Sequence, residues 1–178
     1  MSRENVELWR GVIEDFRGAS SGSSWEGWLE RVAEFMDPAI VWDASEQPAL
    51  DIAEVYRGRE AVLQWWRQWL AAWQTVEFDY ELVDAGDRVV LLLDQRMRGR
   101  STDIEVPMGK YAHIATVKDG LMVHWKHYES QAKALEAAGL QELAMSSDNR
   151  RADRTNTPVR AARRRRRAAD TRISARWE

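Results

Sequence analysis

Residues 56–73, "YRGREAVLQWWRQWLAAW", constrain the fold more than any other segment of the chain. Their apolar side chains recur every three or four residues, as on one broad face of an amphipathic helix, and four of them are tryptophan: Val62, Trp65, Trp66, Trp69, Leu70 and Trp73. A helix face this wide and aromatic must pack against a large concave surface. We therefore expect a curved sheet beside this helix.

The sequence that follows predicts such a sheet. Apolar and acidic residues alternate over residues 76–82, which indicates a half-buried antiparallel strand. Residues 88–98, 108–118 and 121–128 are predicted as three further strands, the last two joined by an Asp119-Gly120 hairpin turn.

The sequence before residue 56 predicts two amphipathic helices, over residues 2–18 and 24–36, and then a short strand at residues 40–42. A short helix over residues 130–138 closes the pattern. Helices followed by a run of antiparallel strands indicate the α+β class, with the helices packed on one face of the sheet.

Composition divides the 178 residues into two parts. Residues 1–145 have a net charge of −10 and form the predicted domain, whereas residues 146–178 have +7, are rich in Arg and Ala, and are expected to be disordered. Such a tail would bind nucleic acid only nonspecifically. The chain has no cysteine, no apolar run long enough for a membrane span and no secretion-signal pattern at its start, so we expect a cytoplasmic protein.

An ordered set of segments resembles a known family. The segments are "FMDPAIVWDASEQP", "VYRGREAVLQWWRQWL", "DAGDRVVLLL" and "HIATVKDGLMVHWKHYESQAKALEAAGL". Together they resemble the SnoaL-like branch of the nuclear transport factor two-like superfamily over about residues 1–142. The resemblance implies a cone-shaped, curved antiparallel sheet with three N-terminal helices on its concave face, a pocket between them, and a homodimer formed through the sheet.

The same family includes ketosteroid isomerase, polyketide cyclases, scytalone dehydratase and limonene epoxide hydrolase, together with noncatalytic members. By this resemblance Asp43 matches a general base, and a pocket lined by tryptophan would raise its pKa by desolvation. The alternative is an acid at the end of a strand that faces solvent.

His113 matches, by the resemblance, the position of an oxyanion donor, and a buried histidine bonded to backbone is its alternative. His127 stands where limonene epoxide hydrolase has a catalytic Asp, which argues against epoxide hydrolysis. The inward positions of the first helix have no hydroxyl to match the tyrosine of ketosteroid isomerases, although Tyr56 or Tyr111 could replace it.

The expected site consists of catalytic Asp43 and His113 with a set of pocket-lining residues, namely Trp9, Phe16, Trp42, Tyr56, Trp66, Tyr111, Trp125 and His127. We expect no metal and no cofactor. Two functions fit this pattern. One is a cofactor-free isomerase, cyclase or dehydratase that abstracts a proton next to a carbonyl of a hydrophobic small molecule. The other is a noncatalytic ligand-binding or dimerisation module with the same fold.

Overall fold

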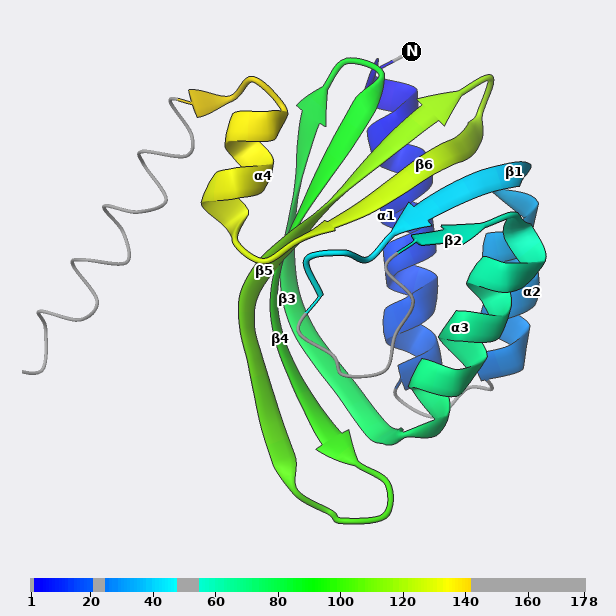
Figure 1. Cartoon of the computed structure of the whole chain (residues 1–178), viewed down its shortest axis with the longest axis vertical. Helices are drawn as coiled ribbons and strands as arrows, with labels where there is room; N and C mark the ends of the chain where they lie inside the picture. The colour runs from blue at the N-terminus through cyan, green and yellow to red at the C-terminus, as the bar shows by residue number, and fades with distance from the viewer. Residues whose placement is uncertain (1, 21–24, 48–54, 142–178) are drawn as a thin grey trace, which may run out of the picture.

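The structure is a computed structural model that describes residues 2–20, 25–47 and 55–141, so the predicted tail lies outside the described residues. In chain order its elements are α1 (Ser2–Ser20), α2 (Trp25–Glu34), β1 (Met36–Asp43), β2 (Val55–Arg57), α3 (Arg59–Ala71), β3 (Trp73–Ala85), β4 (Arg88–Gly99), β5 (Glu105–Lys118), β6 (Leu121–Tyr128) and α4 (Gln131–Ala137). The strands form one sheet in the order β2-β1-β6-β5-β4-β3. Three helices, α1 to α3, lie on one side of the curved sheet and α4 lies on the other (Figure 1). The predicted α+β class is confirmed, with three N-terminal helices against a curved sheet.

Strand β1 differs most from its prediction. It spans Met36–Asp43, whereas the sequence pattern predicts only residues 40–42. It pairs parallel with β6 and antiparallel with the unpredicted strand β2, so the sheet is mixed and not wholly antiparallel. The three residues of β2 are too few to show an alternating pattern. Five other elements separate β1 from β6 in the chain, so no local turn sequence indicates that the two strands run parallel.

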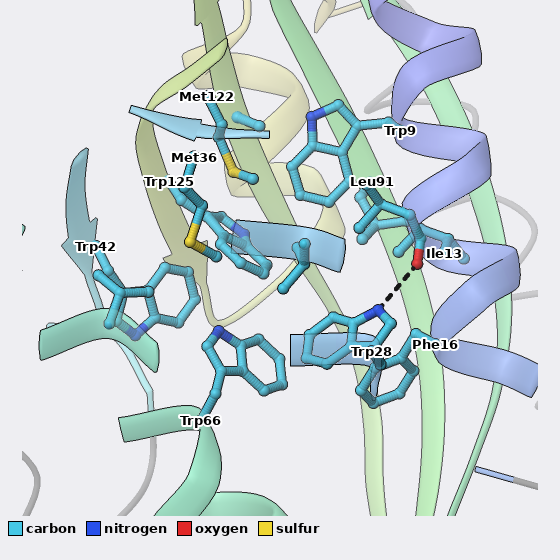
Figure 2. Packing of buried hydrophobic residues seen from close by; sticks show 14 of the residues in the cluster. Trp9, Ile13, Phe16, Trp28, Met36, Trp42, Trp66, Leu91, Met122 and Trp125 are labelled. Carbon is cyan, nitrogen blue, oxygen red and sulfur yellow. Dashed lines mark hydrogen bonds between the residues drawn. The ribbon is translucent and has the colours of Figure 1, made fainter. Parts of the chain in front are cut away.

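The inner face of the sheet packs on the helices through a largely aromatic core. In β3 the predicted alternation is present, because Val76 and Phe78 are buried while Glu77 is exposed. The ring of Trp66 in α3 lies 5.2 Å from that of Trp28 and 5.4 Å from that of Trp125. Figure 2 shows these tryptophans gathered between the helices and the strands. The broad aromatic face of α3 is therefore covered by the sheet and by α2, as its pattern requires.

The outer face of the sheet carries a second, smaller core. Val90 and Leu92 of β4 are buried against Ala134 and Leu135 of α4. This second core explains why the first half of β4 is continuously apolar, since it is buried on both faces. Helix α4 begins at the Ser130 N-cap, whose side chain accepts a hydrogen bond from the Lys133 amide.

The predicted Asp-Gly turn joins β5 to β6. Asp119 and Gly120 both have positive φ, 49° and 78°, as a type I′ hairpin requires. The hairpin, with one irregularity between Thr116 and Val117, pairs His113 of β5 directly with His127 of β6. The two histidines are thus brought together by strand register.

Candidate functional site

A cavity lies between the helices and the inner face of the sheet, with about 50 Å³ open to the centre of a water molecule. Its lining consists of Trp9, Val12, Ile13, Phe16, Trp28, Trp66 and Trp69 from the helices, and Phe78, Leu91, Leu93, Gln95, Tyr111, His113 and Trp125 from the sheet. Among these described residues there is no Lys, Arg, Asp or Glu. A lining without formal charge disfavours a charged ligand, because nothing would compensate the loss of its hydration.

The structure brings six of the ten expected site residues to this cavity: Trp9, Phe16, Trp66, Tyr111, His113 and Trp125. The other four, Asp43, Trp42, Tyr56 and His127, do not line it. Trp42 and His127 are buried and contact the lining residue His113. The ring centroid of His113 lies 5.3 Å from that of Trp42 and 5.2 Å from that of His127. Tyr56 lies on β2, with its ring 6.1 Å from that of Trp65.

Asp43 faces away from the cavity. Side chains alternate along β1, so the buried Trp42 places Asp43 on the opposite face of the sheet. There the carboxylate lies 3.2 Å from Lys126 Nζ and accepts hydrogen bonds from the Ser45 hydroxyl at 2.6 Å and the Ser45 amide at 3.1 Å. The expected position of Asp43 in the pocket is therefore wrong, and the period-two rule applied to Trp42 would have predicted this.

The pKa of Asp43 also differs from the expectation. Partial burial raises it, but the hydrogen bonds from Ser45 and the charge of Lys126 outweigh burial, so the pKa lies below its ordinary value. A carboxylate outside the cavity cannot reach a carbon acid bound inside it, so Asp43 lacks the position expected of the base.

His113 and His127 form a buried pair on the inner face. His113 Nε2 lies 3.2 Å from His127 Nδ1, a hydrogen-bond distance, and the two side chains are 7% and 2% exposed. The second nitrogen of each ring, His113 Nδ1 and His127 Nε2, is buried and has no hydrogen-bond partner among the described residues. The pair is thus bonded internally and has one unused nitrogen at each end.

Burial keeps both histidines neutral. It lowers the pKa of His113 well below its ordinary value, and the proximity of His127 lowers it further. Burial also lowers the pKa of His127 to about 4, although the Glu46 carboxylate acts in the opposite direction. At neutral pH each ring can therefore donate from one nitrogen and accept at the other.

Sequence reasoning missed Gln95, a buried polar residue of the cavity. The Tyr111 hydroxyl donates a hydrogen bond to Gln95 Oε1, and burial raises the pKa of Tyr111. Gln95 follows Leu91 and Leu93 at two-residue spacing, so its inward direction could have been read from the sequence. The sequence could not show that Gln95 meets Tyr111, because the register of β4 with β5 shifts between Gln95 and Arg96.

Three indole N–H groups of the lining residues are buried without a partner among the described residues: those of Trp9, Trp66 and Trp125. Each such donor costs about 1–3 kcal/mol unless an acceptor reaches it. As expected from the sequence, α1 places no hydroxyl at the cavity, since it contributes only Trp9, Val12, Ile13 and Phe16. Indole N–H groups are thus the hydrogen-bond donors that the helices can offer.

Within residues 2–20, 25–47 and 55–141, no three His, Cys, Asp or Glu side chains come together as metal ligands. None of the helices in the described part of the chain combines the length and apolar character that crossing a bilayer requires.

Comparisons with known proteins place this arrangement in a family. Solved structures with the same fold include a nuclear transport factor two-like protein of unknown function from Burkholderia pseudomallei K96243, which is 18% identical, covers 76% of this chain and 97% of that chain, and has a TM-score of 0.58. TerC, co-crystallised with polyporic acid, is 14% identical over 76% of this chain and 98% of that chain, with a TM-score of 0.55. A hypothetical protein with a ketosteroid isomerase-like fold from Catenulispora acidiphila DSM 44928, in complex with trimethylamine, is 15% identical over 72% of this chain and 92% of that chain, with a TM-score of 0.51.

At these identities the solved structures show the fold alone. No curated protein matches the sequence. The family model described as the SnoaL-like domain matches residues 23–125, which is more than half of the chain. The chain therefore belongs to the SnoaL-like domain family.

Proposed function

We propose that this protein binds a small, uncharged, carbonyl-bearing molecule in the aromatic cavity, and that His113 transfers a proton to or from it without a cofactor. The reaction class is isomerisation, cyclisation or dehydration through proton abstraction next to the carbonyl. The observation that carries the proposal is the buried histidine pair, of which one member, His113, lines a cavity whose other described lining residues include no Asp, Glu, Lys or Arg.

The lining supports a flat ligand with a hydrogen-bond acceptor. Aromatic rings favour planar molecules, and the unpartnered indole groups of Trp9, Trp66 and Trp125 favour a carbonyl oxygen. Two proteins of the same fold were crystallised with small organic molecules, polyporic acid and trimethylamine.

Ligand size follows from the cavity. About 50 Å³ is a third of the roughly 150 Å³ that holds benzene in an engineered protein cavity, so a ring-sized ligand needs side chains to move. Trp69 is the one described lining residue that is not fully buried. We therefore propose that the ligand enters beside Trp69.

The chemistry uses the neutral form of His113. A neutral imidazole can accept a proton from carbon next to a carbonyl, and a positioned general base contributes about 10²- to 10⁴-fold in rate. The resulting enolate oxygen would be stabilised by the indole donors. Such donors replace the hydroxyl that α1 lacks.

The test uses cyclohex-3-enone, a small ketone whose isomerisation to the conjugated enone is followed by ultraviolet absorbance. We expect the protein to accelerate this reaction above the buffer rate, and His113→Asn to reduce the acceleration by about 10²-fold or more. His124→Asn is the matched control, since His124 is half-buried on β6 and does not line the cavity. Equal rates for the wild type and His113→Asn would refute the assignment of His113.

Asp43→Asn separates this assignment from the one expected from the sequence. With Asp43 ion-paired to Lys126 outside the cavity, we expect its loss to change turnover by less than about twofold. A loss as large as that of His113→Asn would return the base to Asp43.

A noncatalytic binding module is the second candidate. It is favoured by the lack of a carboxylate among the described lining residues. Under this alternative cyclohex-3-enone quenches the fluorescence of the cavity tryptophans, and its isomerisation stays at the buffer rate.

Three further expectations from the sequence complete the proposal: a homodimer formed through the sheet, a cytoplasmic location, and an independent domain over residues 1–145 with an Arg-rich appendage. Light scattering on the full chain and on a version ending at residue 145 tests the first and the last together. A dimer for both versions is the expected result.

A further inference from the structure

We infer that His127 is the proton store of the site: it takes up the proton that leaves His113 and so moves positive charge from the cavity toward Glu46. This inference rests on the proposed function, and it adds a direction to the proton transfer and a role for two residues that do not line the cavity.

The geometry gives the pair an inner and an outer end. His113 and His127 are directly opposed on β5 and β6, with Nε2 of the first 3.2 Å from Nδ1 of the second. Only His113 of the two lines the cavity. The unused nitrogens, His113 Nδ1 and His127 Nε2, are both buried and have no hydrogen-bond partner among the described residues. When His113 accepts a proton from the ligand, it can therefore pass its other proton to His127 across the shared hydrogen bond.

Charge favours movement toward the outer end. Glu46, which follows β1, accepts a hydrogen bond from the Glu129 amide at 3.3 Å and lies 3.5 Å from Lys133 Nζ. Its carboxylate favours a positive charge on His127, in opposition to burial, whereas at His113 both burial and His127 oppose the charge.

The other described side chains whose rings contact the pair are uncharged. The Tyr111 ring stacks on that of His127 with centroids 5.0 Å apart, and its hydroxyl is bonded to Gln95. The rings of Trp42 and Trp125 meet His113 edge-on at 5.3 and 5.4 Å. Among the described residues Glu46 is the carboxylate that acts on His127. Glu46 is therefore the charged group whose removal tests the direction of transfer.

The transfer balances as follows. At rest each ring carries its proton on Nε2, so His113 Nε2–H donates to His127 Nδ1 and His113 Nδ1 is bare. The ligand C–H proton binds His113 Nδ1, and its electron pair stays on the ligand as an enolate. The His113 Nε2 proton moves to His127 Nδ1, which makes His127 the imidazolium and leaves His113 neutral. Reversal returns one proton to another ligand atom, and no oxidant or co-reactant takes part.

The first experiment needs no ligand. Nitrogen-15 NMR of the full chain, which has three histidines, reports which ring nitrogen of each carries a proton. We expect His113 with a bare Nδ1 and a protonated Nε2 at neutral pH, and His127 protonated before His113 as the pH is lowered. Finding the proton of His113 on Nδ1, or His113 protonated first, would overturn the inference.

The role of Glu46 is tested in the same titration. Glu46→Gln should lower the midpoint of His127 by about half a pH unit or more, because it removes the opposing charge. Glu129→Gln is the matched control, since Glu129 also contacts Lys133, at 2.7 Å, and does not act on His127. Equal shifts in the two variants would remove Glu46 from the inference.

The catalytic arm compares two substitutions at the outer histidine with cyclohex-3-enone as the probe. His127→Asn keeps an acceptor for the His113 N–H but cannot take a proton, whereas His127→Phe loses both properties. If His127 stores the proton, we expect both variants to lose about tenfold or more of the rate. If His127 only positions His113, we expect His127→Asn to keep the wild-type rate and only His127→Phe to lose it. If the probe is not turned over, the proposed function fails while the NMR result still decides the direction of the pair.

Discussion

Acid should destabilise the folded protein through its two buried histidines. Above pH 6.5 each is neutral in the folded and the unfolded state and contributes nothing to the pH dependence. As the pH falls below 6.5 the unfolded chain takes up protons that the folded chain does not, so the free energy of unfolding decreases. For His127 the decrease continues until its folded pKa of about 4 is reached.

The magnitude follows from the two pKa values. With 6.5 for the unfolded chain and about 4 for the folded one, the cost of His127 at pH 5 is about 2 kcal/mol. His113 acts in the same direction, because its pKa also lies well below 6.5. The pair should therefore remove at least about 2 kcal/mol between pH 7 and pH 5, out of the roughly 5–15 kcal/mol typical of a domain. Asp43 does not contribute in this window, because its lowered pKa affects stability only at more acidic pH.

The assay is urea unfolding at pH 7, 6 and 5, followed by tryptophan fluorescence. The double variant His113→Leu and His127→Leu removes both buried polar partners together, and should lose most of the pH dependence. His124→Leu is the control, since His124 is only half-buried and should leave most of the dependence in place. A double variant that loses as much stability as the wild type between pH 7 and pH 5 would refute the reasoning.

Three other predictions test the packing around the site. Trp28→Phe should cost about 1–3 kcal/mol in chemical denaturation, because it removes the indole bond to the Val12 carbonyl at 3.2 Å (Figure 2). Gly58→Ala should lower the free energy of unfolding by about 1–3 kcal/mol in the same assay, since φ is +86° at this helix start. Gly11→Ala, on the exposed face of α1, should instead raise the free energy of unfolding by about 0.5–1 kcal/mol. Trp69→Ala should increase quenching of the remaining tryptophan fluorescence by acrylamide, and unchanged quenching would place the entrance elsewhere.

Local pattern was sufficient for the parts of the fold that depend on residues close in sequence. The tryptophan spacing of α3, the alternation in β3 and the Asp-Gly turn each predict an element that the structure contains. Alternation also predicts that Trp125 and His127 share a face of β6, as observed. These features depend on the helical and strand periods, which a single segment displays by itself.

The site depended on which strands pair and in which register. The family resemblance placed Asp43 in the pocket, but the parallel pairing of β1 with β6 sets it beside Lys126 on the other face. The pairing of His113 with His127 follows from the register of β5 and β6, and that of Tyr111 with Gln95 from β4 and β5. A strand's period shows which face a residue takes. Only the tertiary structure decides which residue it meets there, because register and strand order are set by the packing of the whole sheet.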